Sequence, residues 1–517
     1  MSFIYLFRKL FSKFDRLTDS LTSYKLLYWI LWTFIGWGAF ASLVGLGSIS
    51  YKWYQILWSA FFLIIICWLV NEAIARFLNI PKNTESYAIT ALILALIMTP
   101  ASNLAGFYVL AGVGAIAISS KYLLTFRRAH VFNPAAFGAF LMAIIFHKYA
   151  SWWVGTSILT PIIFAGGWLI LRKMKRYILV SAFLSVYLLL MLIHSGNGSL
   201  HHDWHLVWAT LIETQLLFFA YIMLTEPMTS PTLLERYIPY AVIVAAAYGS
   251  LYWHIGNWQP VFTPEQALLI GNIFAFIFAF SPRYPLKLVK KNPEAQEIKS
   301  FVFAKPAGFN FKAGQYMEWT FPSSKSDNRG NRRYLTIASS PTEDNLMITL
   351  KMPEKRSWYK TALDEAKEGS QMLASRLSGS FTLPENKQQK LVFMAGGVGI
   401  TPYRSMIKYM LDSNDIRDTR LLYAVNNPQE VAYKELLTSA KRNSIKTYVV
   451  VSNPPSHWGG LKGYITDEII KQAVPDYKDR VFYISGPLPF VNAMEKELSK
   501  LKISARKIKT DYFPGYA

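Results

Sequence analysis

The clearest chemical pattern in this sequence is a glycine-rich stretch, LVFMAGGVGITPYRS, at residues 391–405. Its apolar first half predicts a buried strand, and the glycines and the Thr-Pro pair that follow predict a turn into a helix. Glycines let backbone N–H groups approach a phosphate at the N-terminus of a helix. We therefore predict that the loop binds the diphosphate of a dinucleotide through Gly396, Gly397, Gly399, Thr401 and Pro402.

Four further motifs accompany this loop in a fixed order. They are FKAGQYMEWTF (311–321), NRRYLTIASSP (331–341), GSFTLP (379–384) and YISGP (483–487). With the loop, they resemble the ferredoxin–NADP reductase superfamily over residues 297–517. The resemblance implies an antiparallel β-barrel that binds FAD at 297–386, and an α/β domain that binds NAD(P) at 387–517. The implied cofactors are FAD and either NADH or NADPH, because the stretch VNNPQE (425–430) does not decide between the two.

The same resemblance implies roles for residues around the flavin. Arg333 is expected to hold the FAD pyrophosphate, because a guanidinium offers a planar fork of donors. Thr336 is expected to be a catalytic residue beside the flavin N5 edge. Leu335 occupies the place of an aromatic residue that packs on the flavin, and its neighbour Tyr334 is able to contribute. The residues expected to close on the diphosphate are Gly379, Ser380 and Phe381.

The nicotinamide side of the site is expected at the YISGP motif. Ser485, the second expected catalytic residue, stands where most relatives of this superfamily have a cysteine, and Gly486 and Pro487 keep the turn that follows. The final residues, TDYFPGYA, resemble a C-terminal segment in which an aromatic ring covers the flavin. Phe513 and Tyr516 are the residues expected in that role.

The first half of the chain has a different character. The chain has 517 residues, of which 52% are hydrophobic, and the apolar runs are concentrated between residues 26 and 281. A membrane-spanning helix needs about 20 apolar residues. Ten ranges approach this length: 26–46, 54–74, 86–101, 104–120, 133–148, 152–171, 178–194, 205–224, 237–254 and 264–281. We therefore predict a multi-domain membrane protein with a polytopic helical bundle at 26–281, followed by the barrel and the α/β domain.

The basic residues indicate the orientation of this bundle. One set of flanks carries almost all Lys and Arg, whereas the opposite set carries only Lys52 and Lys148. By the positive-inside rule, both termini and the reductase half are expected in the cytoplasm, on a multi-pass protein of the cell membrane. Residues 1–25 are expected as a basic amphipathic segment at the cytoplasmic surface, and residues 282–296 as a linker. The net charge of +22 thus points to membrane topology and not to nucleic acid.

Two pairs of similar segments predict a repeat within the bundle. LILALIMTPAS (92–102) matches LFFAYIMLTEPMTSP (217–231), and these segments are expected to end the third and eighth spans. FNPAAFGAF (132–140) matches IGNIFAF (270–276), and these are expected to open the fifth and tenth spans. With five spans per half, this is the pattern of an inverted repeat. These segments resemble the NqrB/RnfD family, the membrane components of the sodium-pumping NADH:quinone oxidoreductase and of the Rnf complex. That resemblance implies a further flavin, FMN or riboflavin, although the motif for its covalent attachment is absent from this sequence.

The expected function is electron transfer from NAD(P)H through FAD to a flavin or quinone site within the bundle, with ion translocation as an added possibility. We expect Asn133, Thr225 and Thr229 to line that inner site. No metal site is expected, because the single cysteine, Cys67, cannot hold an iron–sulfur cluster. Two alternatives remain: a haem-containing reductase of the ferric-reductase type, which would use histidines such as His147, His194, His205 and His254, and a redox-gated transporter.

Overall fold

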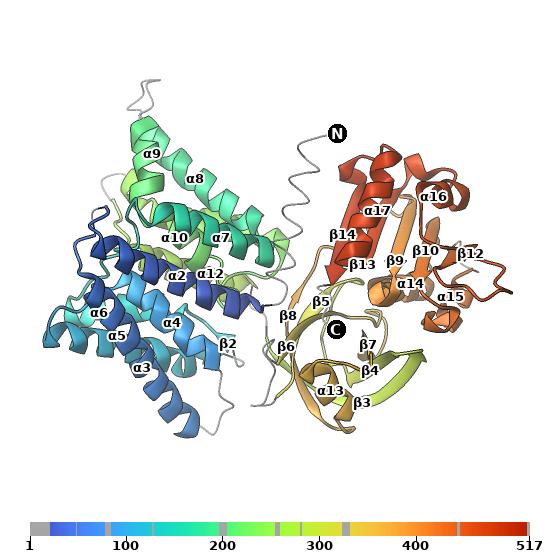
Figure 1. The fold of residues 1–517 in the computed structure, drawn as a ribbon, viewed down its shortest axis with the longest axis horizontal. Helices are drawn as coiled ribbons and strands as arrows, with labels where there is room; N and C mark the ends of the chain where they lie inside the picture. The colour runs from blue at the N-terminus through green and yellow to red at the C-terminus, as the bar shows by residue number, and fades with distance from the viewer. Residues whose placement is uncertain are drawn as a thin grey trace. The chain divides into compact units, whose positions relative to one another are not determined.

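The computed structural model describes residues 21–47, 49–77, 84–126, 129–195, 204–253, 259–279, 282–322, 331–441 and 445–513. The chain divides into two compact units, Met1–Pro282 and Arg283–Ala517 (Figure 1). Each unit is described by itself.

The first unit is helical. Its helices are α2 (Ser23–Leu43), α3 (Trp53–Phe77), α4 (Thr84–Ile97), α5 (Leu104–Leu123), α6 (Pro134–Phe146), α7 (Thr160–Met174), α8 (Tyr177–Ser195), α9 (Trp204–Glu213), α10 (Leu216–Phe218), the π-helix η1 (Phe219–Met223), α11 (Tyr237–Tyr248) and α12 (Pro264–Ala279). Short 3-10 turns η2 (Leu234–Arg236) and η3 (Ser250–Tyr252) and a two-residue pair of strands, β1 (Thr125–Phe126) and β2 (Ala129–His130), complete it.

Each of the ten expected ranges contains a helix, but ten spans are not shown. Within the described residues, only α2, α3, α5 and α8 are long and apolar enough to cross a membrane. A fifth follows if α9 and the α10–η1 segment, which meet at a bend of 63°, are taken as one broken span. Helices α4, α6 and α12 are apolar but shorter. The difference arises because Pro and Asn start or stop several apolar runs before they reach membrane length.

The helices pack in a pattern that recurs along the chain. Helix α3 packs on α5 and α5 packs on α6, as α8 packs on α11 and α11 packs on α12. A glycine permits close approach in each half. A Cβ on Gly138 of α6 would lie 2.9 Å from Ala117 of α5, and a Cβ on Gly271 of α12 would lie 2.2 Å from Val244 of α11.

The start of α12 differs from the expectation that IGNIFAF opens this helix. The helix begins at Pro264, where Thr263 and Gln266 exchange hydrogen bonds as a capping box. Asn272 therefore lies in mid-helix, where it is fully buried. The segment that corresponds in position to Asn133-Pro134 of α6 is Thr263-Pro264, because both helices have proline in their first turn.

The second unit begins with a six-stranded antiparallel sheet in the order β6-β5-β8-β3-β4-β7. Its strands are β3 (Tyr284–Ala295), β4 (Ile298–Ala304), β5 (Tyr316–Thr320), β6 (Arg332–Thr336), β7 (Asn345–Lys351) and β8 (Gln371–Ser378), with α13 (Trp358–Glu365) between β7 and β8. Fully buried Trp319, Phe303 and Tyr359 belong to its core. Residues 284–295, expected as part of a linker, instead form β3, because Leu286 and Leu288 alternate with polar residues and are buried.

The rest of this unit is a parallel sheet in the order β12-β11-β10-β9-β13-β14. Its strands are β9 (Leu391–Gly396), β10 (Thr419–Val425), β11 (Ile445–Val451), β12 (Leu461–Lys462), β13 (Val481–Pro487) and β14 (Ile508–Phe513). The helices are α14 (Thr401–Asp412), α15 (Lys434–Ala440), α16 (Asp467–Ala473) and α17 (Leu488–Lys500). Helices α14 and α15 share one core with one face of the sheet, and α16 and α17 share another with the opposite face (Figure 1).

Candidate functional site

The predicted dinucleotide loop lies at the carboxyl end of β9. The strand ends at Gly396, a 3-10 turn (η4) spans Gly397–Ile400, and α14 starts at Thr401 with Pro402 in its first turn. Gly397 has φ +54°, which favours glycine. A Cβ on Gly399 would lie 2.2 Å from the carbonyl oxygen of Ser485, so only glycine lets the loop approach β13 this closely.

Ser485, Gly486 and Pro487 end strand β13, directly beside this loop. Ser485 pairs with Ala395 in the parallel register, so the expected nicotinamide residues meet the expected diphosphate residues at one edge of the sheet. The Ser485 hydroxyl is fully buried and has no hydrogen-bond partner among the described residues. Phe490 covers this edge, since a Cβ on Gly396 would lie 2.6 Å from its ring. Nothing in the sequence motifs singled out Phe490.

The RRYLT residues form β6, which is the edge strand of the antiparallel sheet. Leu335 and Arg333 pair with Met317 and Trp319, two core residues, and therefore share the core face of the sheet. Tyr334 and Thr336 lie on the other face. Thr336 Oγ1 is buried and has no partner among the described residues, whereas the Tyr334 ring is half exposed.

Arg333 lies next to the start of helix α13. Its guanidinium carbon is 5.0 Å from the centre of the Tyr359 ring, and Tyr359 is the second residue of α13. Ser357 is the N-cap of this helix, yet its side chain makes no capping bond, and its buried hydroxyl has no partner among the described residues. A guanidinium, a helix N-terminus and an available hydroxyl are the donors that a diphosphate requires. Ser357 and Tyr359 belong to no motif recognised in the sequence.

A buried charge network contacts the hydroxyl group of Tyr334. Arg376 Nη1 donates to Glu318 Oε2 and lies 3.1 Å from the Tyr334 hydroxyl. Arg376 has φ +55° at a bulge in β8, where the register with β5 shifts, and the bulge redirects its side chain. Burial alone would raise the pKa of Glu318, but the guanidinium groups of Arg376 and Arg332 lower that pKa below its usual value.

The GSF segment lies where the antiparallel sheet meets the parallel one. Gly379 has φ +114°, and its carbonyl accepts a bond from Gln315 Nε2 at 3.4 Å. Ser380 is exposed. The Phe381 ring is buried against Tyr483 and Tyr403, with ring centres 5.1 and 5.9 Å apart. Phe381 therefore packs the junction between the two sheets.

Two expected residues remain at the C-terminus. Phe513 ends β14, and its backbone pairs with Pro487. Tyr516 lies outside the described residues.

Three expected residues of the helical unit form a polar cluster only in part. Asn133 caps α6 and donates from Nδ2 to Glu226 at 2.9 Å, and its backbone N–H donates to the side-chain oxygen of Asn272 at 2.8 Å. Thr229 Oγ1 donates to the same carboxylate at 2.7 Å. The Thr225 hydroxyl, in the turn after η1, donates to the Tyr221 carbonyl of η1 instead. Glu226 and Asn272 thus belong to the cluster. Both lie within the repeat segments recognised in the sequence, but neither is among the expected site residues.

Lys121 and Arg176, which belong to the basic set of flanks, are both buried within the helical unit. Lys121 Nζ donates to the backbone and side-chain oxygens of Ser86, and Arg176 donates to Ser230 and to the Pro231 carbonyl. His147, His194 and His205 lie at or near helix ends, and His254 lies outside the described residues. Among the residues that the structure describes, no group of three or more metal-binding side chains comes together.

The residues of the second unit fit FAD and a nicotinamide dinucleotide. Four buried hydroxyls of this unit have no partner among the described residues, and three of them, on Ser357, Thr336 and Ser485, lie at the N-cap of α13, on β6 and near the end of β13. Each of these three lies beside residues that the motifs mark for the diphosphate, the flavin edge or the nicotinamide.

Comparison with known proteins supports the assignment of the C-terminal half as a reductase. The oxidoreductase NAD-binding domain family matches residues 393–496. A flavohemoprotein of Oceanobacillus iheyensis is 29% identical over 44% of this chain and 58% of its own length. The glycine betaine monooxygenase reductase subunit of Chromohalobacter salexigens is 26% identical over 42% of this chain and 60% of its own length. The chain thus spans about three-fifths of the length of these relatives.

Another relative and one solved structure match the same half. The stachydrine N-demethylase reductase subunit Stc4 of Rhizobium meliloti is 27% identical over 46% of this chain and 69% of that protein. The crystal structure of the Amycolatopsis cytochrome P450 reductase GcoB aligns with a TM-score of 0.41 at 22% identity, over 46% of this chain and 71% of that one. The C-terminal half of the chain is therefore an NAD(P)H-dependent oxidoreductase unit, and its residues 393–496 match an oxidoreductase NAD-binding domain.

Proposed function

We propose that this chain is a membrane-bound flavoprotein reductase that takes electrons from NAD(P)H and delivers them to an acceptor through its helical unit. FAD and NAD(P)H are the cofactors of the C-terminal half. The observation that carries the proposal is the pair of buried, unpartnered hydroxyls of Thr336 and Ser485, which lie at the expected flavin edge and beside the dinucleotide loop.

Different residues of the second unit bind the two diphosphate groups. The loop of Gly396, Gly397 and Gly399 presents its backbone to the coenzyme diphosphate. Arg333 and the start of α13 hold the flavin diphosphate by charge and by N–H donors. A bound FAD would supply the chemistry that links a two-electron hydride donor to one-electron transfer.

The hydroxyl groups orient the reacting rings. Thr336 Oγ1 offers a hydrogen bond to the flavin edge, and Ser485 Oγ offers one to the nicotinamide side. Phe381, Tyr403 and Tyr483 fill the junction between the sheets and exclude water from it.

The helical unit is proposed as the place where the electrons leave. Its four long apolar helices and its recurrent packing are compatible with a membrane domain built from two related halves. The cluster of Asn133, Glu226, Thr229 and Asn272 gathers polar groups among buried apolar helices, where polar groups generally serve a function. We propose that it borders a site for a quinone or a second flavin, FMN or riboflavin, and that electron flow there drives ion movement. We further propose that both termini lie in the cytoplasm.

The proposal is tested on the purified full chain. Mass spectrometry of the extracted cofactors should identify FAD, and anaerobic mixing with NADH or NADPH should bleach the flavin absorption. Thr336→Val should slow this bleaching about 10²-fold or more, the usual worth of a positioned group at the reacting atoms, with Thr438→Val on the exposed face of α15 as the control. A chain that carries no FAD, or a Thr336→Val variant that bleaches at the original rate, would refute the assignment.

A further inference from the structure

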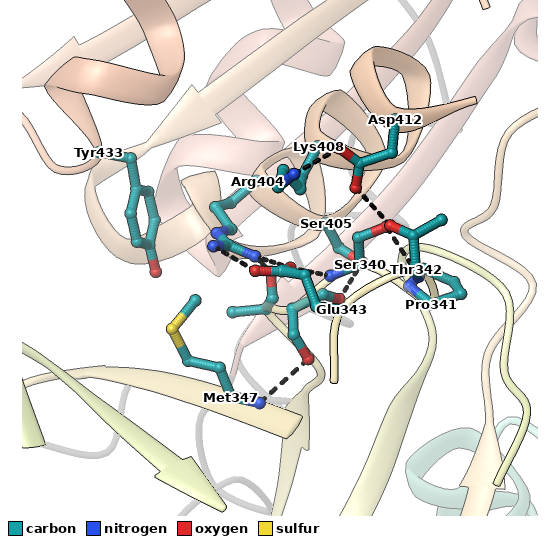
Figure 2. A network of polar contacts seen from close by, with 12 residues as sticks. Ser340, Pro341, Thr342, Glu343, Met347, Arg404, Ser405, Lys408, Asp412 and Tyr433 are labelled. Atoms are coloured by element: carbon teal, nitrogen blue, oxygen red, sulfur yellow. Dashed lines mark hydrogen bonds and ion pairs between the residues drawn. The ribbon is translucent and has the colours of Figure 1, made fainter. Parts of the chain in front are cut away.

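The loop between β6 and β7 is bound tightly to the first turn of α14 (Figure 2). Ser405 Oγ donates to the Ser339 carbonyl at 2.6 Å, and both residues are almost fully buried. Arg404 Nη1 donates to the Ala338 carbonyl at 3.2 Å. Two consecutive residues of the helix thus fasten two consecutive carbonyls of the loop.

An ion pair closes the same contact. Arg404 faces Glu343 with two guanidinium nitrogens, Nη2 lying 2.9 Å from Oε1 and Nη1 bonding Oε2 (Figure 2). Glu343 is itself held in place because its Oε2 accepts the backbone N–H of Ser340 at 2.5 Å. Both side chains are mostly buried, with exposures of 15% and 24%, so solvent screens the pair only in part. A two-pronged Arg–carboxylate contact fixes direction as well as distance.

The position of this contact in the chain gives it a role. Ala338 follows Thr336 by two residues, and Arg404 follows Thr401 by three. Tyr403 lies between Thr401 and Arg404 in the first turn of α14. Its hydroxyl contacts the carbonyls of Tyr483 and Met394, at 2.7 and 3.1 Å, and so fixes this turn to β13 and β9. The flavin-edge strand and the dinucleotide loop are therefore joined by short, well-bonded segments.

We propose that Glu343, Arg404 and Ser405 form an interdomain clamp that sets the distance between the flavin edge and the bound nicotinamide. The inference rests on the proposed function. In the step it governs, the C4–H bond of the dihydronicotinamide breaks and an N–H bond forms on the flavin. The hydrogen carries both electrons, so the nicotinamide is oxidised and the flavin reduced. A misplacement of about 1 Å can cost about 10²-fold in rate, so a clamp acts on the rate more than on binding.

The test compares two arginine variants in the full chain. Arg404→Met removes the clamp and keeps the length of the side chain. Arg420→Met is the matched control, because Arg420 has nearly the same exposure, 16%, and pairs with Asp418 beside its own strand, away from the clamp. Hydrogen exchange by mass spectrometry on flavin-free and flavin-loaded protein reports residues 337–344 and 401–412. Anaerobic stopped-flow reports flavin reduction and the long-wavelength absorption of the stacked nicotinamide–flavin pair.

The clamp predicts a specific combination of results. Arg404→Met should raise exchange in both segments with or without flavin, weaken the long-wavelength band, and lower the reduction rate at saturating coenzyme about 10- to 100-fold. The coenzyme Kd should change less than about threefold, and Arg420→Met should match the original protein. The exchanged pair Glu343→Arg with Arg404→Glu should restore part of the rate. Should Arg404→Met fold poorly, Ser405→Ala removes one hydrogen bond and should give the same pattern at smaller size.

Two different failures can be told apart. If the original chain carries no FAD or shows no flavin reduction, the proposed function is wrong. Hydrogen exchange in the flavin-free protein would still test the clamp in that case. An active original chain with an Arg404→Met variant of equal rate and equal exchange would overturn the clamp alone. A variant that changes only the coenzyme Kd would also overturn it, because binding and not positioning would then depend on Arg404.

Discussion

Two glycines of the dinucleotide loop are expected to lose stability for different reasons, so asparagine should be tolerated better at one of them than at the other. Gly399→Ala places a Cβ 2.2 Å from the Ser485 oxygen and 2.7 Å from Gly486 Cα, whereas real Cβ atoms stay at least 3.0 Å away. The loop or β13 must therefore move by about 0.8 Å. Since both contacts are backbone, we expect a loss of about 1–3 kcal/mol, as for other overpacked sites. For a unit of this size, the melting temperature should fall by about 2–12 °C.

Gly397 provides the contrast. A Cβ there meets nothing within 4 Å, so only its φ of +54° opposes a side chain, at a cost of about 1–2 kcal/mol for alanine. Asparagine tolerates this conformation and should recover part of the loss at Gly397, while Gly399→Asn should be at least as harmful as Gly399→Ala. The rise in flavin fluorescence on heating the full chain measures unfolding, and titration with NAD(P)H measures the affinity of the loop for the coenzyme. If Gly399→Asn proves milder than Gly397→Asn, the close approach to β13 is not what selects glycine.

The other predictions concern the boundary, the flavin, the acid limit and the helical unit. A fragment from Arg283 to Ala517 should fold and reduce ferricyanide, whereas one from Asn292 should aggregate, because it loses the part of β3 that pairs with β8. Arg333→Ala should weaken FAD retention by about 1.5–3 kcal/mol, measured by dialysis, and full retention would contradict its role. Arg417 and Arg376 lower the pKa values of Asp415 and Glu318 against the effect of burial, so these carboxylates stabilise the fold above about pH 4 and cease to do so as the pH falls further. Acid unfolding monitored by circular dichroism should therefore shift to higher pH in Asp415→Asn. Asn133→Ala should abolish quinone reduction in membranes and spare ferricyanide reduction, and equal loss of both with protein yield would make Asn133 structural.

The expected site residues that the structure brings together are those carried by local sequence. Gly397 and Gly399 are needed by a short turn, and Thr336 and Ser485 lie within strands β6 and β13, whose motifs span a few residues. The missed residues act across long separations. Glu343 and Arg404 are 61 positions apart and Glu318 and Arg376 are 58 apart, so only the folded register brings them together.

The errors in the fold have similar causes. The alternation of Leu286 and Leu288 with Lys287 is a strand pattern, but the density of lysines and prolines around it favours a linker. The expectation that Asn272 opens a helix follows from the frequency of asparagine at caps, yet the Thr263–Gln266 capping box places the start earlier. Apolar composition locates the helices of the first unit, but it does not fix where each helix stops, and a span depends on that length.

Strand β3 also has a consequence for synthesis. It is the first strand of its sheet to leave the ribosome, and Tyr284 must wait for its partner Ala374, about 90 residues later. At about 5–20 residues per second, the first part of β3 has no neighbour on that side for about 5–20 s. Strands with open edges pair readily with other chains, and lysines oppose such pairing by charge. The exposed Lys287, which lies within the stretch that later pairs with β8, would thus protect the nascent chain during an interval that the finished structure no longer contains.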